Sequence, residues 1–535
     1  MTAQLVFLNA NVITFDNRQP AAEAVAVIGN RIARVGTNDD IREEIGPETR
    51  VVDLGGRTLL PGFNDNHTHP ISFGIGLGLI DARPAAIPTL AELQDAFRAA
   101  ASANGNGNGR GAWLLARGYD DSRLDVRRHP TRQELDLATG NRPAVLTRTC
   151  GHLAVANSAA LALAGIGPAT ADPVGGQIDR DASGEPTGLL RETAMRLVQD
   201  QIPRTTRAQM KDALRAAGER FLAYGITSVG EAAIRTSDEF AAYQELARDG
   251  ELSVRVFTMM LIDDTLDDLA ALGMRTGWGD EWLRIGPAKL FQDGSGGGRT
   301  AAMSVDYVND PGNRGITIYD QAGLNERFRR AHAAGFQLAA HAIGDRAIEM
   351  ILDSYELVLA ESPKADHRFR IEHCGMCTPR IIDRLARLAV SAVPQPNFIH
   401  ELGDSYIRNF TADQLALSYP ARTWFDRGIL AVGSSDVPVV DCDVLMNLRS
   451  AVTRLTATGQ RMGPEQGVTI DEALRMFTLN GAYASFEERL KGSITPGKLA
   501  DLVVLSGDPR AIPAEDLPTL AVEMTVVDGR VVYEA

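Results

Sequence analysis

The 535-residue sequence predicts an α/β protein with a (β/α)8 barrel or a doubly wound parallel sheet at its centre. Two observations support this fold class. Through the middle of the chain, short apolar runs alternate with helical patterns, as expected where helices connect buried parallel strands. At both ends, β-branched runs flank short turns, which is typical of antiparallel hairpins.

The composition is that of a globular protein, with 44% hydrophobic and 23% charged residues. The 54 Lys and Arg against 69 Asp and Glu give a net charge of −15, so we expect neither nucleic acid nor an anionic membrane as a partner. The longest nearly apolar run, at 71–80, is shorter than the ~18 residues of a membrane helix. The first residues lack the basic start of a secretory leader, and four cysteines make no disulfide framework, so a cytoplasmic location is predicted.

Both chain ends have the pattern of a β-hairpin. Residues 24–35 and 522–533 each consist of two β-branched runs around a two-residue turn that contains glycine. An isolated hairpin is only marginally stable in water, so each of these needs further strands. We therefore predict that residues 1–60 and 486–535 pair into one small composite β domain.

The middle of the chain carries the predicted buried strands and the helices between them. Two helices have a capping-box signal at their start, formed by Thr89 with Glu92 and by Thr469 with Glu472. The predicted strands occupy 142–149, 225–232, 283–291, 336–343, 369–374, 388–396 and 429–436.

Residues 75–210 depart from a simple strand–helix repeat. They are rich in Pro, Gly and Asp, and the Gly/Asn-rich stretch 99–112 is expected to be a flexible surface loop. The 220 residues that separate His69 from Lys289 also far exceed three βα units. We expect an inserted subdomain at about 75–210 within a barrel domain that spans 61–485.

The segment LLPGFNDNHTHP at 59–70 carries the sharpest chemical signal. His67 and His69 are two residues apart after an apolar run, and alternate side chains of a strand point to the same side. Two imidazoles on one side of a strand can bind one metal ion. The alternative interpretation is a pair of surface histidines in a turn.

Four further residues stand at the carboxyl ends of later strand patterns, where the catalytic residues of a (β/α)8 barrel lie. They are Lys289, His341, His373 and Asp436. The separations between the first three, 52 and 32 residues, each correspond to about one βα unit, and the last separation, 63 residues, corresponds to two. Their occurrence in this order favours a shared site.

Each of these four residues also has a purely structural interpretation. Lys289 could pair with Asp293, although a lysine inside an apolar strand is costly unless its charge is paired or removed. His341 or His373 could bond a backbone carbonyl in the core. Asp436 could cap the next helix.

Taken together, the motifs resemble the amidohydrolase superfamily. The similar segments span nearly the whole chain and are, in order, HTH after PG, AKLFQDGS with RTA, HAIGDRA, RIEHC, GSSDVPV and ITPGKLADLVVLSGDP. The branch that the sequence resembles most contains the N-substituted formamide deformylases. The resemblance implies a (β/α)8 TIM barrel with a small β-sandwich built from both termini, and the insertion would follow the first barrel strand.

The same resemblance implies roles for the candidate residues. One or two divalent metal ions would be bound by the four histidines His67, His69, His341 and His373. A carboxylated Lys289 would bridge the ions, Asp436 would be a ligand and proton shuttle, and His152 would face the substrate. Two departures from the family pattern are the glycines at 296–298 and Glu231, where the family often has Asp.

We therefore predict a metal-dependent hydrolase that cleaves a C–N bond of an amide or formamide. Zinc is the expected metal, because the ligands are rich in histidine. Asp436 would act as general base and then general acid, and His152 would stabilise the developing oxyanion. The expected partner is a small-molecule amide, and a homo-oligomer is compatible with the sequence. The alternatives are a deaminase on the same barrel, which would release ammonia, and a metal-free scaffold.

Overall fold

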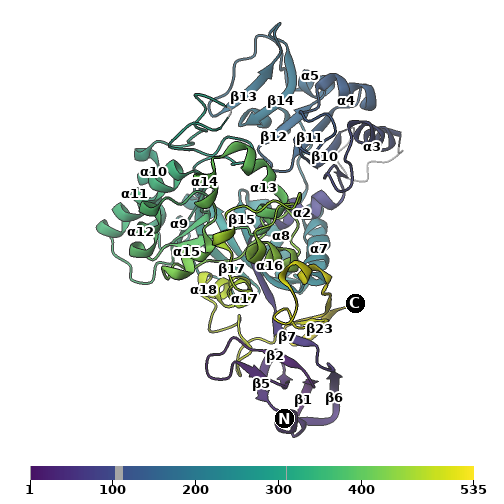
Figure 1. The fold of residues 1–535 in the computed structure, drawn as a ribbon, viewed down its shortest axis with the longest axis vertical. Helices are drawn as coiled ribbons and strands as arrows, with labels where there is room; N and C mark the ends of the chain where they lie inside the picture. The colour runs from purple at the N-terminus through teal and green to yellow at the C-terminus, as the bar shows by residue number, and fades with distance from the viewer. Residues whose placement is uncertain (1, 103–112, 309) are drawn as a thin grey trace.

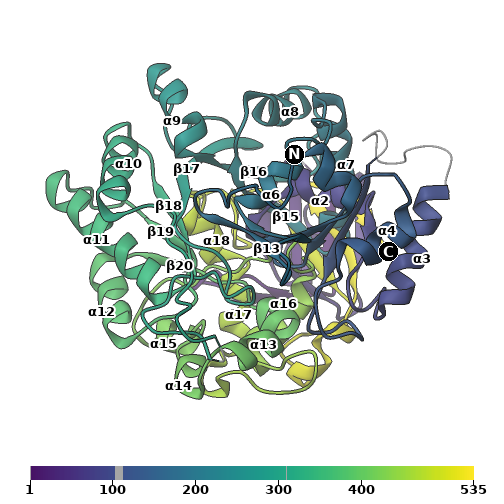
Figure 2. The same cartoon turned by 90° about the horizontal axis from the view of Figure 1, so that it is seen from above.

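The computed structural model describes residues 2–102, 113–308 and 310–535. Its centre is a seven-stranded parallel sheet in the order β20-β19-β18-β17-β16-β15-β8, rolled into a barrel (Figures 1 and 2). The strands are β8 (Phe63–Thr68), β15 (Ile226–Ile234), β16 (Arg255–Leu261), β17 (Leu283–Phe291), β18 (Leu338–Ala342), β19 (Arg370–His373) and β20 (Ser391–Val393).

Residues 430–433 occupy the eighth strand position and close the barrel. On one side, Ala392 of β20 donates its N–H to Leu430 O at 3.0 Å, and Val432 donates to Ala392 O at 2.9 Å. On the other side, Asn66 of β8 donates to Gly433 O at 3.3 Å. The predicted (β/α)8 TIM barrel is thus confirmed, with its last strand reduced to a short bridged segment.

Helices surround the barrel, as Figure 2 shows from above. They are α7 (Arg207–Ala223), α8 (Ser237–Arg248), α9 (Ile262–Ala271), α10 (Gln321–Ala333), α11 (Asp345–Glu361), α12 (Pro379–Leu388), α13 (Asn397–Asn409), α14 (Ala412–Ala416), α15 (Ala421–Asp426), α16 (Val444–Thr453), α17 (Ile470–Met476) and α18 (Leu479–Ala484), with a 3-10 turn at Pro464–Gln466. The capping box of Thr469 and Glu472 starts α17 as predicted.

The barrel strands form because their residues are apolar enough to be buried on both faces. All nine residues of β15 and all seven of β16 are buried. β16, which begins with the charged Arg255, is absent from the strands that the apolar runs predicted. The predicted strand at 142–149 corresponds to β11 (Ala144–Arg148), which lies in a separate sheet and not in the barrel.

That separate sheet is inserted between the first two barrel strands, after the short α2 (Pro70–Leu77). Its six strands, in the order β13-β14-β12-β11-β10-β9, are β9 (Ile80–Asp81), β10 (Leu114–Tyr119), β11, β12 (Leu153–Ala156), β13 (Gly176–Arg180) and β14 (Pro186–Glu192). Four short helices accompany it: α3 (Leu90–Ser102), α4 (Arg132–Thr139), α5 (Ser158–Leu163) and α6 (Ala194–Gln199). Of the predicted loop at 99–112, the first four residues end α3, and 103–112 lie outside the described residues.

Two further sheets hold the strands near the chain ends, and the second of them joins strands from both ends. One sheet has the order β5-β4-β1-β6 and the other β23-β22-β21-β7-β2-β3. Their strands are β1 (Ala3–Leu8), β2 (Asn11–Ile13), β3 (Ala21–Ala22), β4 (Ala24–Ile28), β5 (Arg31–Gly36), β6 (Ile45–Asp53), β7 (Thr58–Pro61), β21 (Leu502–Leu505), β22 (Val522–Val527) and β23 (Arg530–Glu534). A small helix α1 (Asn38–Arg42) and a 3-10 turn at Ala514–Thr519 complete this part. Both predicted hairpins are present, as β4–β5 and β22–β23.

The terminal sheets share one core and attach to the barrel through a buried ion pair. Phe7 and Val27 from the start of the chain pack with Val504 and Val526 from its end. Arg255, at the start of β16, donates to both carboxylate oxygens of Asp501 (2.6 and 3.0 Å) and to Asp528 (3.2 Å). The sandwich therefore sits at the amino end of the barrel strands, and the inserted sheet lies at the opposite end (Figure 1).

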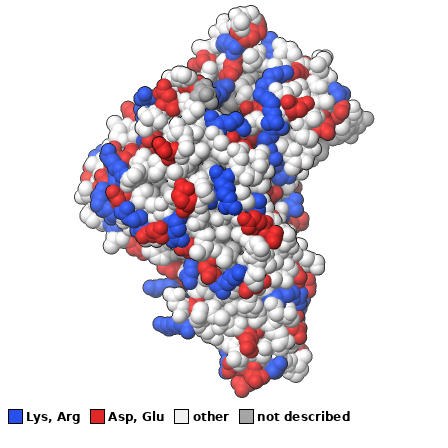
Figure 3. Space-filling model, viewed as in Figure 1, with Lys and Arg blue, Asp and Glu red and all other residues white. Residues whose placement is uncertain are grey.

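Basic and acidic side chains are interspersed on the face shown in Figure 3. Among the described residues, no helix combines the length and the apolar character that a membrane span requires.

Deleting residues 522–535 should destabilise the protein severely. The deletion removes β22 and β23, and with them the buried side chains of Val522, Met524, Val526 and Val527. At ~1.5–3 kcal/mol for each such side chain, the loss approaches the whole free energy of unfolding of a typical domain. Soluble yield and melting temperature are the measurements, and deletion of 534–535 alone is the control. A soluble 1–521 protein with the parent melting temperature would contradict the shared core.

Candidate metal centre and substrate cavity

Three candidate ligands converge at the carboxyl end of the barrel. His67 lies on β8 and His69 directly after it. Asp436 follows the segment 430–433 that closes the barrel. One ligand atom of each lies within 4.8 Å of the others. Asp436 Oδ1 is 3.2 Å from His69 Nε2 and 3.5 Å from His67 Nε2. Because residues i and i+2 of the strand face the same side, both imidazoles reach one carboxylate.

The other two predicted histidines extend this group. His341 is the last residue but one of β18, and His373 is the last residue of β19. The ring centroids of His341 and His373 are 4.4 Å apart, and those of His67 and His373 are 5.0 Å apart. The four imidazoles therefore form one continuous cluster at the barrel mouth, since His67 and His69 are in turn 5.6 Å apart.

Three of the four imidazoles are held by a hydrogen bond at one ring nitrogen, which leaves the other nitrogen for a ligand. His67 Nδ1 donates to Glu372 Oε2 at 2.5 Å, and His373 Nδ1 donates to Gln395 Oε1 at 2.6 Å. His341 Nε2 donates to the carbonyl of Gly294 at 3.0 Å. A hydrogen bond of this kind fixes the ring orientation and the tautomer of a metal-binding histidine. The carbonyl bond expected in the structural interpretation of His341 is thus present and compatible with ligation through Nδ1.

His67 and His373 are kept neutral, as metal ligation requires. Burial, and next the charge of Lys289, lowers the pKa of His67 well below its ordinary value. Burial, and next the neighbouring His341, does the same to the pKa of His373. A neutral ring presents a lone pair instead of a proton at the nitrogen that faces the cluster. For His69, burial opposes protonation, but the hydrogen bonds to Asp436 and Glu231 outweigh burial and raise the pKa.

Lys289 lies fully buried on β17 beside the cluster. Its Nζ makes no hydrogen bond in the described parts of the chain, and its nearest aromatic contact is the ring of Phe291, with the centroid at 4.7 Å. Burial lowers the pKa of Lys289 to about 8, although Glu372 and Asp436 oppose this shift. The alternative that Lys289 pairs with Asp293 is wrong, because Asp293 accepts the backbone N–H groups of Ile343 and Gly344.

The backbone around Asp436 is held in an unusual conformation. Asp436 has a φ of 62°, and His373 has a φ of 69°, both in the left-handed region that side chains rarely occupy. Asp65 fixes this loop by accepting the N–H of Ser435 at 2.8 Å. The alternative that Asp436 caps the next helix is wrong, since Asp443 is the N-cap of α16.

Several residues that support the cluster were not predicted. Glu372 receives Arg370 Nε at 2.5 Å while it holds His67, and Glu231 lies 3.7 Å from His69 Nδ1. Arg370 and Glu372 alternate in the predicted strand RIEH and are both fully buried. Charged residues inside a buried strand are costly unless paired, so this alternation was a usable signal.

His152 directly precedes β12 of the inserted sheet and faces the histidine cluster at the carboxyl end of the barrel. Its ring centroid is 5.9 Å from that of His341, and its Nδ1 lies 2.8 Å from Glu192 Oε2. Burial opposes protonation of His152, but the Glu192 carboxylate outweighs burial and raises the pKa to about 10. His152 therefore faces the cluster as a cation at neutral pH.

A cavity of about 590 Å³ opens beside the cluster, between the inserted sheet and the barrel. Its lining includes His152, Glu192, Lys289, Phe291 and Asp293, together with the start of α9 and residues 316–319. A cavity of this size admits a small organic molecule.

Comparison with known proteins agrees with this architecture. Residues 50–533 match the amidohydrolase family. The chain is 31% identical to a putative amidohydrolase, YtcJ, of Bacillus subtilis, covering 96% of each chain. It is 33% identical to an N-substituted formamide deformylase of Arthrobacter pascens, covering 99% of this chain and 98% of that protein.

A solved structure shows the same arrangement. An uncharacterized metal-dependent hydrolase from Pyrococcus horikoshii superposes with a TM-score of 0.77 at 25% identity, covering 95% of this chain and 99% of that one. The family match runs from within β6 through every barrel strand into β23 and so includes the whole candidate metal centre. From this match and from the relatives that align along nearly its full length, we conclude that the chain belongs to the amidohydrolase family.

Proposed function

We propose that the protein is a metal-dependent hydrolase that cleaves the C–N bond of a small amide or formamide. The observation that carries this proposal is the convergence of His67, His69 and Asp436 beside a buried, unpartnered lysine at the edge of a 590 Å³ cavity. The similarity to a formamide deformylase supports the bond type. No other reaction class is favoured by a particular contact in the site.

The residues present fit one or two divalent metal ions. His67, His69, His341, His373 and Asp436 would hold the metal, and their nitrogen-rich character favours zinc. A divalent ion lowers the pKa of a bound water from ~15.7 to about 7 and polarises the carbonyl oxygen of the substrate.

Asp436 is proposed to move the proton during hydrolysis. Burial opposes its ionisation, but the hydrogen bond to His69 and the neighbouring imidazoles outweigh burial and lower the pKa of Asp436. The carboxylate therefore accepts a proton from the attacking water and then donates it to the nitrogen that leaves. The hydrogen bond that Ser435 N–H donates to Asp65 keeps the Asp436 carboxylate directed at the cluster.

His152 is proposed to stabilise the charge that develops on the substrate oxygen. As a cation, it can donate a strong hydrogen bond, and Glu192 holds its other nitrogen in place. Because its pKa is about 10, this donor is present throughout the neutral range and is lost only in strong alkali.

Lys289 is proposed to react with dissolved carbon dioxide. The neutral amine forms a bond to the carbon of CO₂ and loses one proton, which gives a carbamate anion. The unpartnered, buried Nζ supports this step, because the product replaces a desolvated cation by an anion that the metal cluster would bind.

The purified protein should contain divalent metal and hydrolyse N-acyl compounds. Elemental analysis and a panel of N-formyl and N-acyl amines, assayed for released carboxylic acid and for ammonia, test both statements. Strong chelators should abolish the activity, and zinc should restore it. Release of ammonia without an acid product would assign the protein to the deaminases instead, and full activity at well under one metal equivalent would refute metal dependence.

Replacing Asp436 by Asn should remove the base while keeping the shape of the side chain. We expect kcat to fall at least ~10²-fold, the low end for loss of a general base, while much of the metal is retained. Asp443→Asn is the matched control, because Asp443 caps α16 seven residues further on and Asn is an equally good cap. Similar kcat values for the two variants would rule out the proton-transfer role.

Lys289→Ala should lose metal and activity together. Short carboxylates such as acetate should restore part of the activity, since they can occupy the space of the carbamate. Lys498→Ala, which changes a half-buried lysine near the terminal sheets, is the control for loss of stability. Metal content and kcat equal to those of the parent would exclude Lys289 as a ligand.

A further inference from the structure

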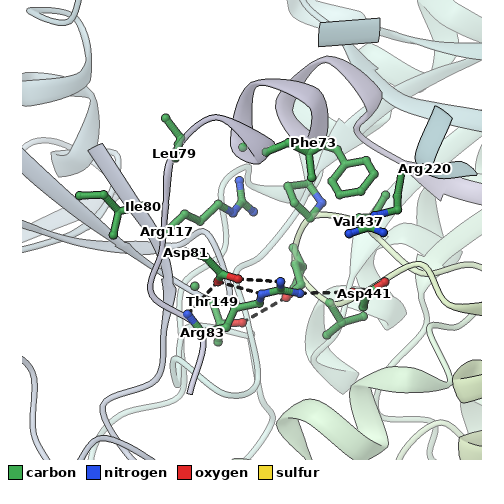
Figure 4. A pocket seen from close by; sticks show the side chains of 16 residues that line it. Phe73, Leu79, Ile80, Asp81, Arg83, Arg117, Thr149, Arg220, Val437 and Asp441 are labelled. Atoms are coloured by element: carbon green, nitrogen blue, oxygen red, sulfur yellow. Dashed lines mark hydrogen bonds and ion pairs between the residues drawn. The ribbon is translucent and has the colours of Figure 1, made fainter. Parts of the chain in front are cut away.

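A second cavity, of about 240 Å³, lies on the other side of the Asp436 loop (Figure 4). It is bounded by α2, by β9 and β10 of the inserted sheet, and by residues 437–441, which directly follow Asp436. The reaction described above leaves this cavity without a role.

Arg117 of β10 extends into this cavity without a partner. Figure 4 shows its side chain in the space between Ile80 and Phe73. Its Nε is buried without a hydrogen-bond partner, and its guanidinium makes no ion pair with the described residues. A desolvated cation of this kind is costly, and the cost is removed when an anion binds.

The neighbouring Arg83, in contrast, has carboxylate partners. Arg83 Nη2 lies 2.7 Å from Asp81 Oδ2, and its Nη1 lies 3.2 Å from Asp441 Oδ2. These two carboxylates are the acidic residues in the cavity lining, and both are occupied by Arg83. They therefore leave Arg117 uncompensated.

A second arginine adds to the positive charge of the cavity. Arg220 of α7 is exposed at the rim and lies 5.7 Å from the ring centroid of Tyr224, with no carboxylate partner in the described residues. Beyond the lining, Asp436 is the carboxylate that acts most strongly on Arg117, and burial still lowers the pKa of Arg117. The chain as a whole carries a net charge of −15. Two guanidinium groups without carboxylate partners at one cavity therefore depart from its general charge.

Apart from Thr149, the other side chains of the lining are apolar. Phe73, Leu79, Val437 and Val440 form the walls, and Leu77 is 46% exposed at the edge. An inorganic anion would leave this surface uncovered. A molecule with an anionic head and a short apolar body satisfies both the arginines and the walls.

We propose that this cavity is a binding site for a small organic carboxylate. Its carboxylate is held by Arg117, whose planar fork matches two carboxylate oxygens, and is attracted by Arg220. Its apolar body lies against Phe73, Leu79 and Val440. The carboxylate belongs either to the substrate itself or to a separate ligand, because Val437 joins the cavity wall to the Asp436 loop.

Direct binding to the purified, metal-loaded protein tests the site. Calorimetry with hexanoate, and with 1-hexanol as the neutral counterpart, should show binding of the acid alone. Arg117→Met should weaken hexanoate binding at least ~10-fold at unchanged metal content, while Arg117→Lys should retain part of it. Arg220→Gln should have a smaller effect, and Arg215→Gln, on the same helix but outside the cavity, should have none.

The stability of the variant gives an independent readout. Without hexanoate, Arg117→Met should melt at or above the temperature of the parent, because it removes an unpaired buried charge. Hexanoate should raise the melting temperature of the parent and not that of Arg117→Met. Equal hexanoate binding by the two proteins, as expected for a carboxylate held by the metal alone, would overturn the proposal. A large destabilisation by Arg117→Met would overturn it as well.

Kinetics then distinguish the two sources of the carboxylate, and this arm alone rests on the proposed hydrolase function. For a matched pair of N-acyl substrates with and without a carboxylate, Arg117→Met should lower kcat/KM selectively for the acidic substrate if the carboxylate is part of the substrate. An equal effect on both substrates indicates a separate ligand. An absence of hydrolysis would count against the proposed function and leave the binding measurement intact.

Discussion

The candidate site depends on the seam at which β8 meets the chain around Asp436. Asp436 donates its N–H to His67 O at 2.8 Å, and His69 donates to Val437 O at 2.8 Å. The same backbone bonds therefore close the barrel and place three ligand side chains within 4.8 Å of one another. Any change that opens this seam separates the ligands as well as the strands. The left-handed φ of Asp436 is the local consequence, since the chain must turn there while its amide stays bonded to β8.

A network of buried charges sets the orientation of the cluster. Arg370 donates to Glu372 and to the carbonyl of Asn66 at 2.9 Å, so one guanidinium links β19 to β8. Glu372 in turn holds His67. Each of these groups is paired, as buried charges must be. Lys289 is the exception within the cluster, because its Nζ has no partner. The proposed carbamate would explain why an amine is buried there unpaired.

The barrel and the insertion contribute different things. The barrel supplies the candidate metal ligands, including Asp436, whereas the inserted sheet supplies His152 to one cavity and Arg117 to the other. The segment from Thr149 to His152 separates the two cavities, with Thr149 lining one and His152 the other. Selectivity for the substrate can thus change through the insertion while the chemistry of the barrel end stays the same.

The sequence by itself determined the local features of this protein. Apolar runs predicted most barrel strands, glycine-containing turns predicted both hairpins, and the order of strand-end residues pointed to His67, His69, Lys289, His341, His373 and Asp436. The strand and turn signals are readable because each depends on neighbouring residues only, and the strand-end order is readable because βα units follow one another along the chain. Only the tertiary structure decided how distant residues pair: that Glu372 holds His67, that Asp65 fixes the Asp436 loop and that Asp443, not Asp436, caps α16. The unpaired state of Arg117 belongs to the same class, because a missing partner is visible only when every neighbour has been placed.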